Sequence, residues 1–125
     1  MHEQVADEKA LFEIDVTGAK LLVLSAHGDP FAMSFAGKHA RTLDSSDRAR
    51  LAALFAKLDP HATILLQSCE TGRGFAHLVK ELAGESRRVI AAKGEIPRDG
   101  VVIASLAPFD VTITCSDGSD CTLRL

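Results

Sequence analysis

The sequence contains no tryptophan and no tyrosine, and six phenylalanines are its only large aromatic residues. A core must therefore be built mainly from Leu, Val, Ile and Ala. No apolar run approaches the roughly 18 residues of a membrane-spanning helix. The first four residues include Glu3 and lack the basic stretch of a secretory signal. These absences predict a protein without a membrane partner. Its expected location is the cytoplasm, with delivery elsewhere by another route as the alternative.

The chain also lacks a basic excess, an even cysteine count and any cluster of metal ligands. Its net charge is -3, which argues against a nucleic-acid partner. Three cysteines cannot form a complete disulfide framework. Cys115 and Cys121 flank a turn and could pair in an oxidising environment, but we interpret them as two strand-packing thiols. Their C-x₅-C spacing has no second ligand pair, so neither a metal nor a cofactor is expected.

What the chain does contain is an alternation of buried strands and amphipathic helices within one domain of 125 residues. Leu11–Val16 alternates apolar and acidic residues and predicts an edge strand, turned at Thr17–Ala19 into the next strand. Apolar residues recur at helical spacing after the N-cap candidates Asp44–Ser46, and again before Gly84. The further strands are expected at Lys20–Ala26, Met33–Phe35, Thr63–Ser68, Arg88–Ala92, Val101–Ser105, Val111–Cys115 and Cys121–Leu125.

The region 20–92 therefore predicts an α/β fold with central parallel strands, helical crossovers and antiparallel edge strands. Right-handed crossovers place the three central strands side by side and both helices on one face. The second face would be covered by the N-terminal residues and the C-terminal hairpin, or by a second copy in a homodimer. His27 and Cys69 both follow carboxyl ends of these strands, where ligands bind in open α/β sheets. A thiol nucleophile and its base require such proximity.

These residues resemble the caspase-like (clan CD) cysteine peptidases. Gln67-Ser68-Cys69-Glu70-Thr71-Gly72 is similar to the caspase pattern Q-A-C-[RQG]-G, which has an upstream histidine. Ser68 replaces alanine, Glu70 replaces arginine, and the glycine falls one place late. The order Ala26-His27-Gly28, Met33–Gly37, Leu65–Cys69, Phe75 and Leu82-Ala83 looks closer to bacterial CHAT domains and toxin self-processing domains. The similarity covers residues 20–95 and implies a caspase-like sheet of two or three layers.

The resemblance implies a hydrolase, a thiol protease with a Cys–His dyad. Cys69 would be the nucleophile, His27 its acid–base partner, and the backbone N–H groups of Gly28 and Cys69 the oxyanion hole. The helix expected near Arg73 would lower the thiol pKa of Cys69. In the clan, residues after the next strand wall the substrate pocket, which would be Lys93–Ile96 here.

Charged residues near this expected cleft are weaker candidates. Asp29, Arg73 and Glu95 are substrate-binding candidates, each set against the interpretation of a solvated loop charge. His61 and His77 compete poorly as the base, because one begins the strand that Cys69 follows and the other lies on the next helix.

Two functions follow from the same fold. The first is a cysteine endopeptidase or self-processing domain, with a protein or peptide, including this chain itself, as substrate. The second is a catalytically inactive caspase-like domain that serves as a protein-binding or dimerisation module. The second is motivated by the short region before His27 and by the sheet face for which the sequence offers no helix.

Overall fold

The computed structural model describes residues 15–25, 27–29, 32–34, 42–43, 47–67, 74–97, 100–106 and 109–125. Two helices and nine strands are assigned in these residues. In chain order they are β1 (Leu21–Ser25), β2 (His27–Asp29), β3 (Ala32–Ser34), β4 (Thr42–Leu43), α2 (Arg48–Ala56), β5 (Thr63–Gln67), α3 (Phe75–Ala83), β6 (Arg88–Ala92), β7 (Val101–Leu106), β8 (Phe109–Ile113) and β9 (Thr122–Arg124).

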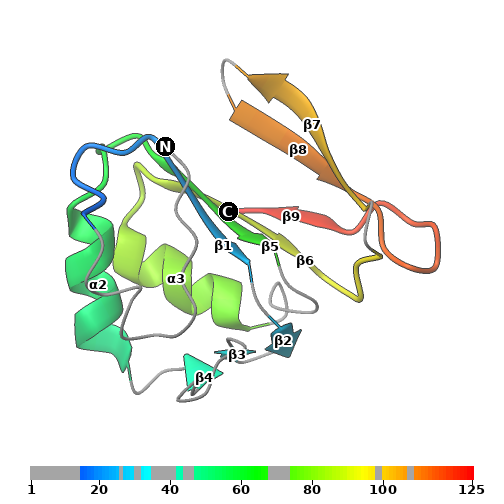
Figure 1. Cartoon of the computed structure of the whole chain (residues 1–125), viewed down its shortest axis with the longest axis horizontal. Coiled ribbons are helices and arrows are strands. Elements are labelled where there is room, and N and C mark those ends of the chain that lie inside the picture. Colours follow the sequence, from blue (N-terminus) through cyan, green and yellow to red (C-terminus); the bar gives the residue numbers. More distant parts are fainter. Residues whose placement is uncertain are drawn as a thin grey trace.

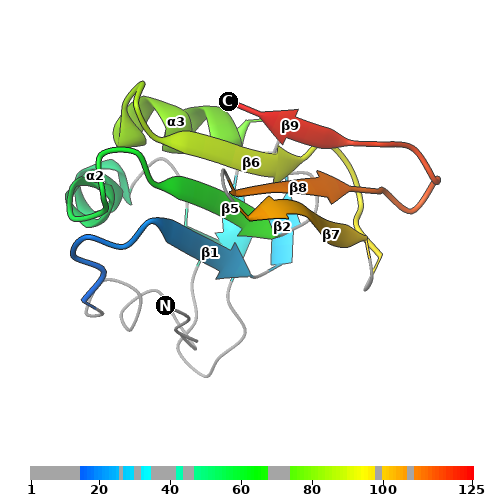
Figure 2. The ribbon, with the colours of Figure 1, turned by 90° about the horizontal axis from the view of Figure 1, so that it is seen from above.

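The main sheet has four strands in the order β1-β5-β6-β9 (Figure 2). β1, β5 and β6 are parallel, and β9 joins the edge antiparallel to β6. The parallel pairs are separated in sequence by α2 and α3, as a parallel connection requires a crossover. The predicted order of the three central strands is therefore confirmed.

Both helices lie on the same face of this sheet (Figure 1). The helical spacing predicted from the sequence is confirmed, because Leu51, Leu54, Phe55 and Leu58 are all at most 3% exposed. They pack in one cluster with Phe75, Val79, Ile64 and Leu66. α3 ends at Ala83 and is followed by its C-cap Gly84, whose φ of 89° is open to glycine and strained for other residues.

The opposite face of the sheet is covered by a two-stranded ribbon of β7 and β8 (Figure 1). Leu65 and Ile90 alternate with the helix-facing residues of their strands and pack here with Val111 and Ile113 of β8. This arrangement explains why the central strands are apolar on both faces. The expected covering of the second sheet face by C-terminal residues is therefore found in part, because β8 of the same chain packs on it.

The predicted C-terminal hairpin divides between two sheets. Its turn is present, with a bridge between Thr114 and Asp120, but β8 pairs with β7 whereas β9 pairs with β6. Both predicted strands are present, although β8 begins and ends two residues earlier than expected and β9 is one residue shorter at each end. The prediction that they pair mainly with each other is wrong. Alternating apolar residues fix which faces of a strand are buried, and they leave the neighbouring strand undetermined.

Two N-terminal expectations differ from the structure or lie outside it. Asp15 and Val16 precede the turn at Gly18 without belonging to a strand, so the strand predicted to reach Val16 is wrong at its end. Residues 11–14 lie outside the described residues. The N-cap of α2 is Asp47, one residue beyond the predicted Asp44–Ser46, and its side chain makes no capping hydrogen bond.

The fold is thus a mixed α/β architecture with a parallel-containing sheet and two helices. None of the helices in the described part of the chain has the length and apolar character needed to cross a membrane.

Candidate functional site

The carboxyl ends of β1 and β5 lie at the same position in the sheet. Their last residues, Ser25 and Gln67, are register partners. His27 comes two residues after Ser25, and Cys69 comes two residues after Gln67. The two predicted dyad residues therefore follow a pair of matched strand ends by the same number of residues.

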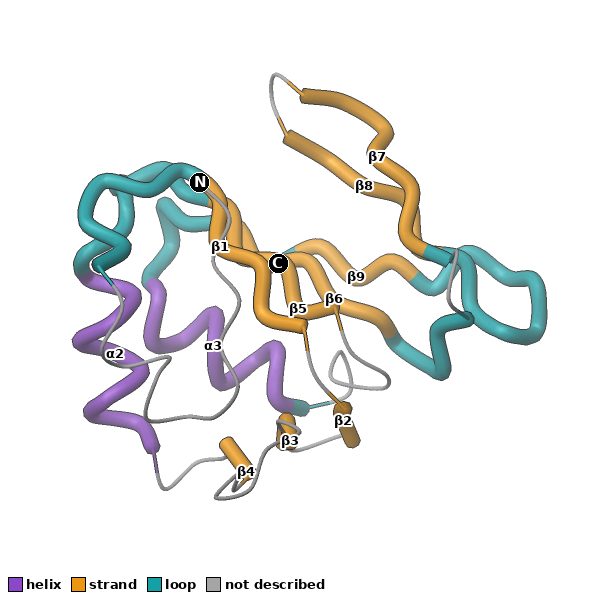
Figure 3. The backbone as a smooth tube through the Cα atoms, viewed as in Figure 1, coloured by secondary structure: helices purple, strands orange, loops and turns teal. Residues whose placement is uncertain are grey.

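The backbone of His27 opens β2, part of a small antiparallel sheet β2-β3-β4. Figure 3 shows β2 beyond the end of β1, with β3 and β4 beside it. His27 pairs with Ser34, Gly28 with Met33, and Asp29 with Ala32. The small strand predicted around Met33 is confirmed, and it pairs with the strand that carries the candidate base.

Cys69 and Arg73 lie outside the described residues, so the dyad and this substrate-binding candidate remain predictions. The next described residue along the chain is Gly74, the N-cap of α3. α3 begins at Phe75, slightly later than the start predicted near Arg73.

Segment 93–97 follows β6 at the same end of the sheet. It contains Lys93–Ile96, the predicted pocket wall. The Glu95 side chain is exposed, and its backbone carbonyl accepts a 2.8 Å hydrogen bond from Ser116 N–H. Lys93 N–H donates to the carbonyl of Cys121 at 3.0 Å. Turn 115–121 therefore holds this segment through its backbone.

Cys115 and Cys121 form a disulfide, so the interpretation of two separate thiols is wrong. Their Cα atoms lie 5.7 Å apart, a separation typical of disulfides, because the turn centred on Gly118 brings the chain back on itself. Gly118 has a φ of 86°. The sequence signal for this pairing is the position of the two cysteines on either side of a glycine-centred turn.

Aspartates order this turn. Asp117 accepts hydrogen bonds from the side chain and backbone of Ser119, and Asp120 accepts them from the side chain and backbone of Thr122. These bonds to the ionised carboxylates lower the pKa of both Asp117 and Asp120. Thr122 Oγ1 also accepts a 2.8 Å bond from Ile113 N–H, which ties the turn to β8.

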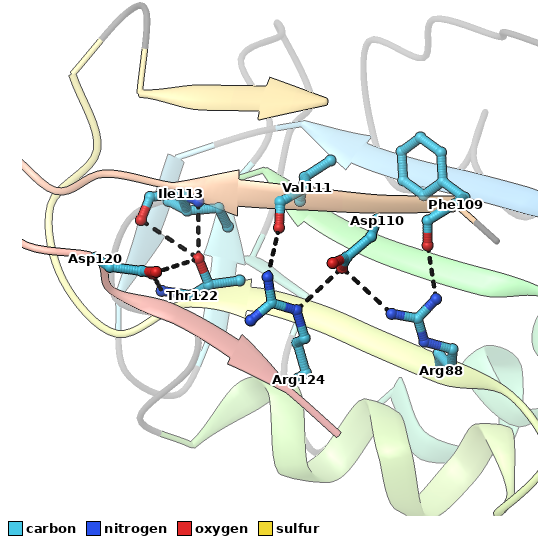
Figure 4. A network of polar contacts seen from close by, with 8 residues as sticks. All are labelled: Arg88, Phe109, Asp110, Val111, Ile113, Asp120, Thr122 and Arg124. Carbon is cyan, nitrogen blue, oxygen red and sulfur yellow. Dashed lines mark hydrogen bonds and ion pairs between the residues drawn. The ribbon is translucent and has the colours of Figure 1, made fainter. Parts of the chain in front are cut away.

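A second polar contact fixes the other end of β8, as Figure 4 shows. Asp110 accepts hydrogen bonds from Arg124 Nε at 3.0 Å and from Arg88 Nη2 at 3.3 Å. The same arginines donate to the carbonyls of Val111 and Phe109. The Arg124 bond, reinforced by the positive charges of Arg124 and Arg88, lowers the pKa of Asp110. No local sequence pattern indicates this network, because its members come from three separate strands.

The competing histidines lie where the sequence placed them. His61 precedes β5, at the end of the strand opposite to the one that Cys69 follows, and its backbone N–H donates to Asp59 Oδ1. His77 lies on α3 and is exposed. No group of three or more His, Cys, Asp or Glu side chains suited to a metal ion occurs among the described residues.

We compared the chain with known protein families, curated proteins and solved structures. No family model matches the chain, and neither a curated protein nor a solved structure matches it.

Proposed function

We propose that this chain is a caspase-like cysteine peptidase with Cys69 as nucleophile and His27 as its acid–base partner. The observation that supports the proposal most directly is the matched register of Ser25 and Gln67. Because the two strands end together, the residues that follow them start from neighbouring points of one sheet edge. His27 and Cys69 each follow one of those points by two residues in the sequence, and this equal spacing supports a contact between them.

The chemistry follows from the residue types. The Cys69 thiolate attacks the peptide carbonyl carbon, and the backbone N–H groups of Gly28 and Cys69 stabilise the negative oxygen. The C–N bond then breaks as the His27 imidazolium gives its proton to the leaving amine. Water hydrolyses the resulting thioester and regenerates the thiol. Asp29, Arg73 and Glu95 are the proposed substrate contacts, and the substrate is a protein or peptide, including this chain.

The test is the rate of iodoacetamide labelling of Cys69 from about pH 5 to about pH 9, the range in which an activated thiol departs from an ordinary one of pKa about 8.5. The disulfide simplifies this experiment, because under non-reducing conditions it leaves Cys69 as the free thiol among the three cysteines. We expect fast labelling below pH 7 in the parent and loss of that advantage in His27→Ala.

His61→Ala is the matched control, because His61 lies beyond the opposite end of β5. It should label like the parent. Equal labelling of the parent and His27→Ala at every pH would contradict the dyad.

A second function, a binding or dimerisation module, is favoured by β7. Val102, Ile103 and Leu106 are 59%, 60% and 77% exposed, and among the described residues β7 pairs only with β8. The strand carries no charged residue and no proline, the features that usually protect a sheet edge from pairing. A second copy fits it, because two identical uncharged strands can pair antiparallel. This edge, rather than the covered sheet face, is the proposed dimer contact.

A further inference from the structure

Turn 115–121 and segment 93–97 are connected at three points. The Ser116–Glu95 and Lys93–Cys121 backbone hydrogen bonds are two of them. The third is a close approach at Gly94, where a Cβ atom would lie 3.1 Å from Cys115 Sγ. The disulfide therefore lies directly against the segment and fixes the turn that bonds to it.

The disulfide restrains the turn covalently, and its loss would leave the turn to its hydrogen bonds alone. Gly118 N–H donates to the Cys115 carbonyl, and Cys115 N–H donates to the Ser119 carbonyl. Residues 116–120 are exposed, whereas Cys115 and Cys121 are each 6% exposed. A reductant can reach the sulfurs when this short surface turn opens, while the core on the helix side of the sheet stays closed.

We propose that the Cys115–Cys121 disulfide is a redox-sensitive clamp on segment 93–97, closed when oxidised and released when reduced by a dithiol. That this segment walls a substrate pocket rests on the proposed function. The clamp itself rests on the contacts above. In an oxidising compartment the segment is held against the turn, and in a reducing cytoplasm it is released.

The reduction balances as a thiol–disulfide exchange. One thiolate of the dithiol attacks Sγ of one cysteine, the S–S bond breaks, and the other cysteine leaves as a thiolate that takes up a proton. The second thiol of the reductant then displaces the first cysteine from the mixed disulfide. Two electrons and two protons pass to Cys115 and Cys121, and the dithiol becomes a disulfide.

Amide hydrogen exchange, followed residue by residue with and without dithiothreitol, tests the clamp. Lys93 and Ser116 are the reporters, because their N–H groups form the two connecting bonds. We expect their exchange to accelerate about fivefold or more on reduction, as when a hydrogen bond is lost. Val89, whose N–H donates to the Leu125 carbonyl in the same sheet, is the internal control and should be unchanged.

Three results would overturn the clamp. Lys93 and Ser116 could exchange at the same rate in both states, which would show that the bonds persist without the disulfide. All three amides could accelerate together, which would show global unfolding. The disulfide could also resist dithiothreitol until denaturant is added, which would make it a permanent staple.

A variant at Gly94 provides an independent measurement. In the oxidised protein the disulfide holds Cys115 Sγ in place, so Gly94→Ala should lower the Tm by several degrees. In the reduced protein the freed thiol can rotate away, and the loss should shrink. Gly84→Ala is the matched control, because its Cβ meets nothing within 4 Å and its strain comes from a φ of +89°. The Tm loss of Gly84→Ala should be the same in the oxidised and the reduced protein. If the Tm loss of Gly94→Ala were also the same in both states, the clamp would be contradicted.

The clamp and the proposed peptidase can be rejected independently, because different measurements test them. Exchange at Lys93 and Ser116 does not involve Cys69, whereas iodoacetamide labelling of the oxidised protein reports on Cys69 and His27. Faster exchange on reduction together with an ordinary Cys69 would keep the clamp and reject the peptidase. An activated Cys69 with unchanged exchange would do the reverse.

Discussion

Ser25 and Gln67 are register partners at the last position of the parallel pair β1–β5. This pairing gives the proposed nucleophile and base a common origin at one sheet edge, and segment 93–97 follows the third parallel strand at the same end.

The first prediction concerns the nucleophile. Cys69→Ala should lower peptide cleavage by about a thousandfold or more, because no other group in the proposed mechanism forms the acyl-enzyme. Circular dichroism and thermal unfolding should match the parent, since the substitution removes one sulfur atom. The measurement is the rate of cleavage of a peptide library by the parent and by the variant. Cleavage retained by the variant would reject the proposed peptidase.

The second prediction concerns acid. The pKa of Asp110 is lowered in the folded protein from its ordinary value of 3.8, first by the Arg124 hydrogen bond. Its stabilising effect is therefore complete above pH 3.8 and is lost as the pH falls through the lower folded pKa. Asp110→Asn should flatten the fall in Tm below about pH 4. Glu85→Gln, which removes the charge of an exposed residue, is the control, and an identical flattening there would contradict the assignment.

The third prediction concerns Arg87, which joins the ends of the two helices. Its guanidinium donates to the carbonyls of Leu58, Asp59 and Ala83 at 3.0, 3.2 and 2.9 Å. Arg87→Ala should lower the free energy of unfolding by about 1.5–3 kcal/mol. Arg48→Ala removes only an exposed ion pair with Glu81 and should cost less than about 1 kcal/mol. Urea titration measures both, and the reverse order would contradict this role.

The fourth prediction concerns Gly100. A Cβ there would lie 2.5 Å from the Thr114 carbonyl oxygen and 2.7 Å from Ile96 Cγ2. Gly100→Ala must push β7 away from the chain after β8 and should cost about 2–3 kcal/mol. Gly118→Ala meets no atom within 4 Å, and its positive φ should cost about 1 kcal/mol. Equal losses of unfolding free energy would show that the contact relaxes without strain.

The fifth prediction concerns β7. If two copies pair through this edge, Ile103→Lys should shift sedimentation towards the monomer, because a charge would be buried in the contact. Ala53→Lys adds the same charge to an exposed position of α2 and should leave the sedimentation of the parent unchanged. A monomeric parent at all concentrations would remove β7 as a dimer contact.

Local patterns predicted the elements of the main sheet well. The recurrence of Leu51, Leu54, Phe55 and Leu58 could be satisfied only by a helix with one buried face. The uninterrupted apolar run in β5 indicated burial on both faces, and the structure distributes its residues between the helices and the ribbon.

Long-range pairings could not be predicted in the same way. The separation of β8 from β9 depends on pairing with β7 and β6, and many registers bury the same side chains. The disulfide and the Asp110 network both depend on how β8 and β9 pair. They could therefore be identified only from the structure. The common end of β1 and β5, two residues before His27 and Cys69 in the sequence, required only the parallel order of these strands. The alignment of these two strand ends could therefore be predicted from the sequence.

The attachment of β8 has one further consequence. One end is held by a carboxylate between two arginines, and the other is held next to a disulfide. Acid acts on both ends, because Asp110 at one end and Asp117 and Asp120 in the turn at the other accept hydrogen bonds as carboxylates. A dithiol acts on the disulfide end alone. Neither agent removes the packing of Val111 and Ile113 against Leu65 and Ile90, so the middle of β8 depends on apolar contacts and its ends depend on solution conditions.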